Sequence, residues 1–173
     1  MMRTTNGRLR LITGTISTDD IIPGKYKHMF TDLNILAKHI FENAHPNLNQ
    51  NLQAGDILWS QDIFGIGSSR EQAPASLQAR GIRALIAPRF GRIFYRNAWN
   101  VGLPVLTISE AAEADYEGAQ ASIDWENGKL TLPTKAVDFP PPPQHLRSIA
   151  SNGGLIATLR LQMKSQTALE QGA

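Results

Sequence analysis

The chain has 173 residues, of which 42% are hydrophobic and 18% charged, and its formal net charge at pH 7 is +2. These values predict a single globular domain over residues 1–173 and argue against a nucleic-acid-binding protein, which would carry denser positive charge. The chain has no cysteine, so it forms no disulfide and holds no thiol nucleophile. Because the N-terminus is polar and no apolar run approaches the ~20 residues of a membrane span, we expect a cytoplasmic protein.

The first two thirds of the chain predict strands and helices in alternation. Strands are expected over residues 8–16, 56–60, 82–88 and 103–108, helices over residues 32–43, 71–80 and 93–101, a polar turn at residues 17–20 and a loop over residues 43–53. Gly81 and Gly102 follow two of the helices, where a left-handed cap favours glycine. Strands joined by helices through short connections indicate parallel βαβ units with both sheet faces covered.

The last third of the chain has a different pattern. Residues 109–120 predict a helix, and residues 121–132 predict a hairpin in which Asn127 and Gly128 form a primed-type turn. The four prolines of residues 140–143 form a stiff connector within the domain. Helices are expected over residues 144–151 and 155–163, separated by a break at Gly153 and Gly154, and residues 164–173 are expected to be a frayed tail.

Residues 65–74, with the sequence GIGSSREQAP, carry the most specific chemical signal of the chain. A glycine turn that leads into a helix offers free backbone N–H groups, and the Arg70 guanidinium can bind a carboxylate through two parallel hydrogen bonds. Ser68 could act as a base where backbone donors and a cation from elsewhere stabilise its alkoxide. An equally good interpretation from these residues alone is structural, with the hydroxyls capping a helix and Arg70 paired with Glu71 or Asp62.

Nucleotide-binding, hydrolase and metal-binding patterns are not matched. Arg70 stands where a dinucleotide fingerprint needs its third glycine, no Gly-Lys-Ser/Thr follows as in a phosphate loop, and there is no Gly-x-Ser-x-Gly nucleophile elbow. The histidines are far apart and have no ligand spacing, which predicts that this chain holds no metal. They are His28, His39, His45 and His145.

Five blocks of sequence, read in order, resemble the small subunits of isopropylmalate dehydratases, the detached swivel domains of the aconitase family. The blocks are residues 18–23 (TDDIIP), 65–74 (GIGSSREQAP), 81–90 (GIRALIAPRF), 93–97 (IFYRN) and 102–104 (GLP). The resemblance implies an α/β fold: a β/β/α swivel domain with a parallel βαβ core and a C-terminal hairpin and helices.

The resemblance also implies an activity, a cofactor and a partner. Members of this family dehydrate and rehydrate a branched hydroxy-dicarboxylate, here most simply 3-isopropylmalate in leucine biosynthesis. The hydro-lyase is active only as a heterodimer with a large subunit, which carries a four-iron, four-sulfur cluster as a Lewis acid for the hydroxyl. No cofactor is expected on this chain, which agrees with its lack of cysteine.

Residue roles follow from the same resemblance. Ser68 is expected to take a proton from carbon, Arg70 to hold a substrate carboxylate, and Ser69 to support binding through a hydrogen bond. The supporting residues around them are Thr18, Asp19, Gly65 and Gly67.

The chain departs from the commonest bacterial pattern at two places. Residues 24–30, where the family reads the side group of the substrate, contain Lys25, Tyr26, Lys27 and His28 in place of an alanine-arginine-tyrosine-leucine run, and Gln72 replaces a histidine. Homoaconitate and 2,3-dimethylmalate therefore remain alternative substrates, because Lys25, Lys27 and His28 would favour a more polar acid if they reach the site. A non-catalytic anion-binding module that uses Arg70 is the alternative from another functional class.

Overall fold

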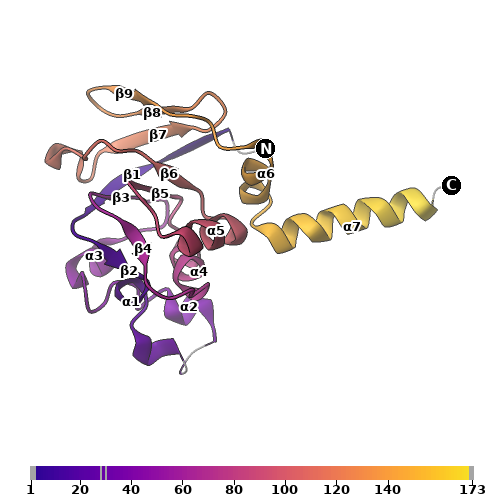
Figure 1. The fold of residues 1–173 in the computed structure, drawn as a ribbon, viewed down its shortest axis with the longest axis horizontal. Coiled ribbons are helices and arrows are strands. Elements are labelled where there is room, and N and C mark those ends of the chain that lie inside the picture. Colours follow the sequence, from indigo (N-terminus) through magenta and orange to yellow (C-terminus); the bar gives the residue numbers. More distant parts are fainter. Residues whose placement is uncertain (1–2, 28, 30, 172–173) are drawn as a thin grey trace.

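The computed structural model describes residues 3–27, 29 and 31–171 (Figure 1). Its strands are β1 (Thr4–Ile12), β2 (Ile16–Ser17), β3 (Ile57–Ser60), β4 (Phe64–Ile66), β5 (Ala84–Ala87), β6 (Val105–Thr107), β7 (Gln120–Asp124), β8 (Lys129–Thr131) and β9 (Ala136–Asp138). Its helices are α1 (Thr18–Ile21), α2 (Leu33–Leu36), α3 (Pro46–Asn51), α4 (Gln72–Ala79), α5 (Arg92–Val101), α6 (Gln144–Ser151) and α7 (Leu155–Gln171), with 3₁₀ turns η1 (Gly24–Lys27) and η2 (Ala114–Tyr116).

Strand β1 joins a parallel and an antiparallel half of one mixed sheet. Within the described residues the strand order is β6-β5-β3-β1-β7-β8-β9, and β2 and β4 pair separately. Residues 9–12 of β1 pair in parallel with β3, and residues 4–8 pair antiparallel with β7. The parallel half consists of residues 9–12 of β1 with β3, β5 and β6, and the crossovers through α4 and α5 confirm the predicted βαβ units.

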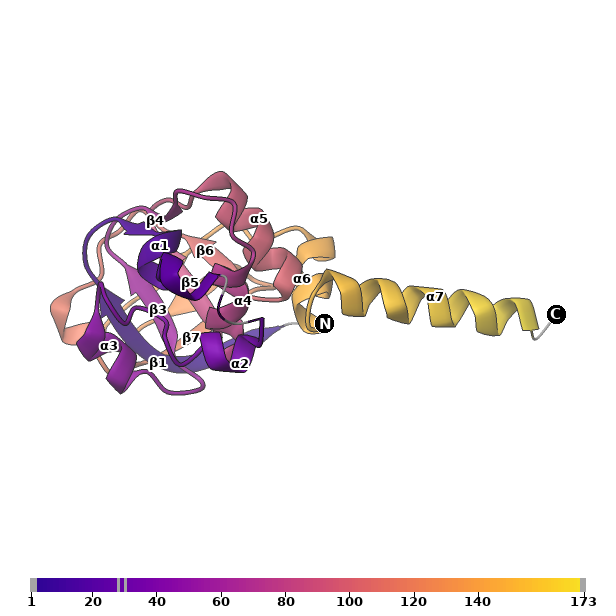
Figure 2. The same cartoon turned by 90° about the horizontal axis from the view of Figure 1, so that it is seen from below.

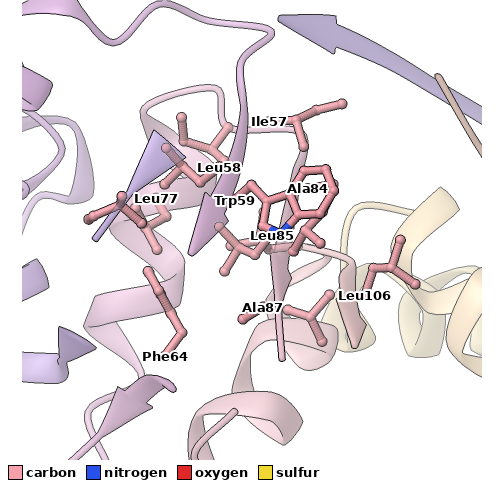
Figure 3. Close-up of a cluster of buried hydrophobic side chains, with 14 of the residues drawn as sticks. Ile57, Leu58, Trp59, Phe64, Leu77, Ala84, Leu85, Ala87 and Leu106 are labelled. Atoms are coloured by element: carbon pink, nitrogen blue, oxygen red, sulfur yellow. The ribbon is translucent and has the colours of Figure 1, made fainter. Parts of the chain in front are cut away.

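The core lies between the parallel strands and the helices that cover them. Every residue of β3 and β5 is buried, because these strands are covered on both faces. The largest fully buried side chains include Trp59, Trp99 and Trp125. Figure 3 shows side chains of β3, β5, β6 and α4 meeting in this core.

The N-terminal third differs from the sequence prediction in its details. The strand expected over residues 8–16 ends at Ile12, and the polar turn at residues 17–20 is the start of α1, where Ser17 and Asp20 form a capping box. The helix expected over residues 32–43 ends at Leu36. Phe41 has a φ of 59°, and its N–H donates to the Ile21 carbonyl (2.9 Å), so the chain turns here instead of continuing the helix.

Two further predictions, a loop over residues 43–53 and a helix over residues 109–120, were wrong. The first segment contains α3, with Pro46 at its first position, where a missing N–H costs nothing. The second contains only the short turn η2 in the described structure. There the Gly118 N–H donates to the Leu9 carbonyl and the Leu9 N–H to the Ala119 carbonyl, so this backbone pairs with β1.

The predicted hairpin is present, but its turn is of another kind. Asp124 pairs with Lys129, which leaves a loop of residues 125–128 rather than a two-residue primed turn. Gly128 has a φ of 68°, whereas Asn127 does not have the positive φ that a primed turn needs. Trp125, the first residue of this loop, is fully buried, and its Nε1 donates to Thr5 Oγ1 (2.8 Å). Because its side chain belongs to the core, the loop is longer than a two-residue turn. Strand β9 extends the hairpin and was not predicted.

The C-terminal helices extend further than expected. Helix α6 has the predicted bounds, and Gly153 and Gly154 have positive φ at the predicted break. Helix α7 continues past residue 163 and through Lys164 to Gln171, where the sequence predicted a frayed tail. It projects away from the rest of the molecule in both ribbon views (Figures 1 and 2). No helix in the described part of the chain is long and apolar enough to cross a membrane.

A contact between the first residue of β4 and the segment that leads into α5 fixes the position of the glycine turn. The Phe64 N–H donates to the Arg89 carbonyl (2.9 Å), and the Gly91 N–H donates to the Phe64 carbonyl (2.8 Å). Gly65 has a φ of 77°, and a Cβ on it would lie 2.2 Å from Phe94 Cγ. Only glycine fits this position without displacing α5.

Glu42 links η1 to the turns that follow α2. Its carboxylate accepts hydrogen bonds from Tyr26 Oη (2.8 and 3.0 Å) and Lys25 Nζ (3.2 Å), and it contacts His39 Nδ1. The hydrogen bond from His39, followed by that from Tyr26, lowers the pKa of Glu42 to about 2.

We predict that Gly65→Ala destabilises the protein by about 2–4 kcal/mol, because it combines a strained φ with an overpacked contact. Gly118→Ala is the matched control, since Gly118 has a φ of 78° but no atom within 4 Å of the place where a Cβ would stand. The control should cost only about 1–2 kcal/mol. Urea unfolding of both variants measures the difference, and equal losses would show that the Phe94 contact does not constrain the turn.

We also predict that Glu42 makes the free energy of unfolding decrease as the pH falls below 4.5. A folded-state pKa of about 2, below the ordinary 4.5, means that its contribution is present above pH 4.5 and is lost as the pH falls towards 2. The free energy of unfolding of Glu42→Gln should therefore fall less over this range than that of the wild type. Tyr26→Phe should be intermediate. Parallel pH profiles for all three proteins would contradict the prediction.

Candidate active site

The last four residues of the motif GIGSSR, residues 67–70, form a turn between β4 and α4. Gly67 has a φ of 97°, and the Arg70 N–H donates to the Ser68 carbonyl (2.8 Å), which closes a tight three-residue turn. Helix α4 begins at Gln72 and has no side-chain cap, so the serines do not cap it as the structural interpretation expected. Ser68 and Ser69 are exposed.

Thr18 supports Ser68 from the first residue of α1. Its side chain is buried, and its Oγ1 lies 3.2 Å from Ser68 Oγ and 3.3 Å from the Ser68 carbonyl oxygen. A Cβ on Gly67 would lie 3.4 Å from the same Thr18 oxygen, so the turn passes close to α1. The structure therefore places the Ser68 hydroxyl against a fixed hydroxyl from a segment 50 residues away.

Asp19, the next residue of α1, forms an ion pair with Arg70. The Arg70 Nη1 contacts Asp19 Oδ1 and donates to the Ile22 carbonyl (3.3 Å). Arg70 therefore pairs with neither Glu71 nor Asp62 among the described contacts. Asp62 instead accepts from Thr15 Oγ1 (2.7 Å), a bond that, with others, lowers the pKa of Asp62. The Arg70 Nε is buried and has no hydrogen-bond partner in the described structure.

A hollow of about 540 Å³ opens beside this turn. It is lined by Thr31, Leu33, Ser68, Ser69, Arg70, Glu71, Gln72 and Ala75. The hollow thus combines one guanidinium, two serine hydroxyls and the apolar side chains of Leu33 and Ala75. A site of this composition can hold an acid that carries an apolar group.

Sequence reasoning did not identify Thr31, Leu33 or Ala75 as site residues. The apolar spacing of the helix expected over residues 32–43 includes Leu33, which predicts a buried side chain. Leu33 is instead 37% exposed, because α2 is short and its first residue faces the hollow. The sequence contains no local signal for this, since the hollow forms only when α2 packs beside α4.

The described side chains of the expected specificity loop do not line the hollow. Lys25 and Tyr26 contact Glu42 rather than the Ser68 turn, and neither lines the hollow. A Cβ on Gly24 would lie 3.5 Å from Asp19 Oδ1 and 3.9 Å from Arg70 Nη2, so the loop begins next to the ion pair. The side chain of Lys27 and the whole of His28 lie outside the described residues.

The described residues contain no group of three or more His, Asp or Glu side chains that could hold a metal ion. The arrangement offers instead a hydroxyl held by a second hydroxyl, next to a guanidinium. Such a pair can bind a carboxylate and exchange a proton with the same molecule.

Comparisons with known proteins identify the family. The model of the aconitase C-terminal domain matches residues 5–111. The 3-isopropylmalate dehydratase small subunit of Aliarcobacter butzleri is 41% identical over 94% of this chain and 98% of its own. Small subunit 1 of the same enzyme from Thermotoga maritima is 41% identical over 89% of this chain and 93% of its own.

A solved structure confirms the expected α/β swivel fold. The crystal structure of 3-isopropylmalate dehydratase from Methanocaldococcus jannaschii superimposes with a TM-score of 0.84 at 34% identity, covering 95% of this chain and 98% of that one. The chain therefore belongs to the aconitase C-terminal domain family and, within it, to the family of 3-isopropylmalate dehydratase small subunits.

Proposed function

We propose that this chain is the small subunit of a hydro-lyase that isomerises 3-isopropylmalate by dehydration and rehydration, a step of leucine biosynthesis. The observation that carries the proposal is the hollow in which Ser68, Arg70 and Leu33 meet, in a chain of this family. Ser68 can exchange a proton with a carbon of the substrate, Arg70 can bind a carboxylate, and Leu33 can contact the apolar side group.

Ser68 is the proposed base. Its side chain faces the hollow, and its Oγ lies 3.2 Å from Thr18 Oγ1, which can donate a hydrogen bond to the Ser68 alkoxide, the form that accepts the proton. Such a donor favours the charged form of the serine. In the rehydration direction the same oxygen returns the proton to carbon, so Ser68 ends each cycle unchanged.

Arg70 is the proposed carboxylate ligand. Its Nη1 is engaged by Asp19 and the Ile22 carbonyl, whereas its Nη2 makes no hydrogen bond in the described structure. The guanidinium is therefore held in one orientation and keeps a donor for a substrate oxygen. Ser69, exposed at the same edge, is placed to add a hydrogen bond.

The rest of the active site is proposed to lie on a large subunit. Iron–sulfur clusters are held by thiolates, and this chain has no cysteine, so its residues do not fit the role of cluster ligands. A four-iron, four-sulfur cluster on the partner would supply the Lewis acid for the hydroxyl. This chain supplies the proton-transfer group and one carboxylate site.

The lining of the hollow favours 3-isopropylmalate over homoaconitate. Arg70 is the one cation that lines it in the described residues, beside Glu71 and the apolar Leu33 and Ala75. A further carboxylate in place of the isopropyl group would meet these apolar side chains and lose its hydration. Lys25 does not offset this loss, since it pairs with Glu42. The side group of the smaller 2,3-dimethylmalate is also apolar and would suit the same lining. This acid therefore stays the alternative substrate, and a substrate panel would distinguish it from 3-isopropylmalate.

We predict that Ser68→Ala, assembled with the large subunit of the same organism, lowers kcat by about 10²–10⁴-fold. Because Ser68 is exposed and makes its side-chain contact only with Thr18 in the described structure, its loss should change stability by about 1 kcal/mol or less. Ser69→Ala is the control on the same turn and should retain kcat within about tenfold. Turnover near the wild-type rate in Ser68→Ala would remove Ser68 from its role.

We predict that Leu33→Ala raises KM for 3-isopropylmalate by about tenfold or more, because it removes part of the apolar wall. KM for malate, which lacks the branched group, should change little. Leu161→Ala is a control on an exposed leucine of α7 (52% exposed), far from the hollow in sequence. Equal changes for both acids would show that Leu33 does not read the side group.

The same assembly experiment tests the non-catalytic alternative. An anion-binding module would bind dicarboxylates through Arg70 equally well with and without a large subunit, and would give no turnover with one.

A further inference from the structure

Helix α5 carries two exposed arginines that form no ion pair with any described residue. Its buried residues are Phe94, Ala98 and Trp99, so Arg92 and Arg96, one turn apart, face outward together. Neither makes a salt bridge or side-chain hydrogen bond with any residue that the structure describes. We call these two residues the arginine ridge.

The arginine ridge separates two hollows. One, of about 440 Å³, is shared with Gly65, Gly67 and Ser68. The other, of about 370 Å³, lies on the far side and is lined also by Phe90, Tyr95 and Thr107. Ile93 lines the first hollow and is 48% exposed, which adds an apolar surface between the charges.

The position of the ridge relative to Ser68 is fixed by backbone contacts. The Gly91 N–H donates to the Phe64 carbonyl (2.8 Å), and a Cβ on Gly91 would lie 2.1 Å from the Gly65 carbonyl oxygen. Helix α5 therefore starts directly against the active-site turn. A body that fills the hollow shared by the ridge and Ser68 would therefore also lie next to that turn.

We propose that the arginine ridge docks an acidic surface of the large subunit and seats that subunit over Ser68. The inference rests on the proposed function, which requires a partner to complete the site. Two unpaired arginines beside an exposed isoleucine and a tyrosine have the composition of an interface centre. Their charge calls for carboxylates on the partner.

Two other occupants fit the surface less well. A small dicarboxylate could reach the hollow shared with Ser68, but it could not also fill the hollow beyond the ridge, which includes Phe90 and Thr107. A second copy of this chain, paired about a two-fold axis at this surface, would bring the same positive charges together. A protein surface with acidic side chains could fill both hollows and pair with the two arginines.

The test measures association separately from turnover. The wild-type chain and the double variant Arg92→Glu, Arg96→Glu are titrated with the cluster-bearing large subunit of the same organism, by calorimetry at low and at high salt. We expect the double variant to weaken Kd by about tenfold or more at low salt, and to lose most of the salt dependence that the wild type shows. Arg160→Glu, an exposed arginine of α7, is the control and should leave Kd unchanged.

The variants are chosen to keep the fold intact. Arg92 and Arg96 are exposed, so the melting temperature of each isolated variant should match that of the wild type. If the double variant fails to fold, the single variants Arg92→Gln and Arg96→Gln carry the same test, each with a smaller loss of affinity. At saturating small subunit, kcat and KM should stay near their wild-type values.

The outcomes separate this inference from the proposed function. An unchanged Kd in an active pair overturns the docking surface and leaves the function standing. A raised KM with unchanged Kd would assign the ridge to substrate binding, and lost self-association with unchanged Kd would assign it to a second copy; both overturn the inference. If the double variant weakens Kd but the wild-type pair shows no turnover, the docking surface is supported and the proposed function is contradicted.

Discussion

The backbones of Gly65 and Gly91 lie against each other, and this contact positions everything that surrounds the candidate site. A Cβ on Gly91 would stand 2.1 Å from the Gly65 carbonyl oxygen, and a Cβ on Gly65 would stand 2.2 Å from Phe94. Phe64, which precedes Gly65 and bonds to Gly91, is fully buried, so the contact is anchored in the core. The Ser68 turn follows Gly65 closely in the chain, and the arginine ridge lies on the helix that begins directly after Gly91. Their relation is therefore set by packed backbone rather than by flexible side chains.

The candidate site also depends on α1, which lies about 50 positions earlier in the chain. Thr18 reaches Ser68 and Asp19 reaches Arg70 from successive residues of one short helix. The capping box of Ser17 and Asp20 fixes the start of that helix. Thr18 is buried while Ser68 is exposed, so a rigid support carries a reactive group at the surface. This arrangement suits a site that a second protein completes.

Local sequence signals predicted the parts of the structure that depend on local chemistry. The apolar run of β5 and the glycines after α4 and α5 indicated the βαβ core. The motif around Ser68 indicated an anion site or, equally well, a structural turn before any resemblance was considered. The pairing of Asp19 with Arg70 was not predictable from spacing, and Thr18 and Asp19 entered only through the resemblance. Three of the failures share one cause. Residues 118–119 pair with β1, Phe41 bonds to Ile21, and Leu33 turns to the hollow because of partners distant in the sequence.

The ion pair between Asp19 and Arg70 suits a substrate ligand better than a purely structural link. The Arg70 side chain is 15% exposed, so its orientation is restricted, whereas the Asp19 side chain is 56% exposed and remains hydrated. A pair with one such exposed member contributes at most about 1 kcal/mol. A substrate carboxylate can therefore share the guanidinium, or displace Asp19, at little cost in stability. Asp19 holds the guanidinium in one orientation, so the carboxylate ligand that we propose would already be oriented when a substrate arrives.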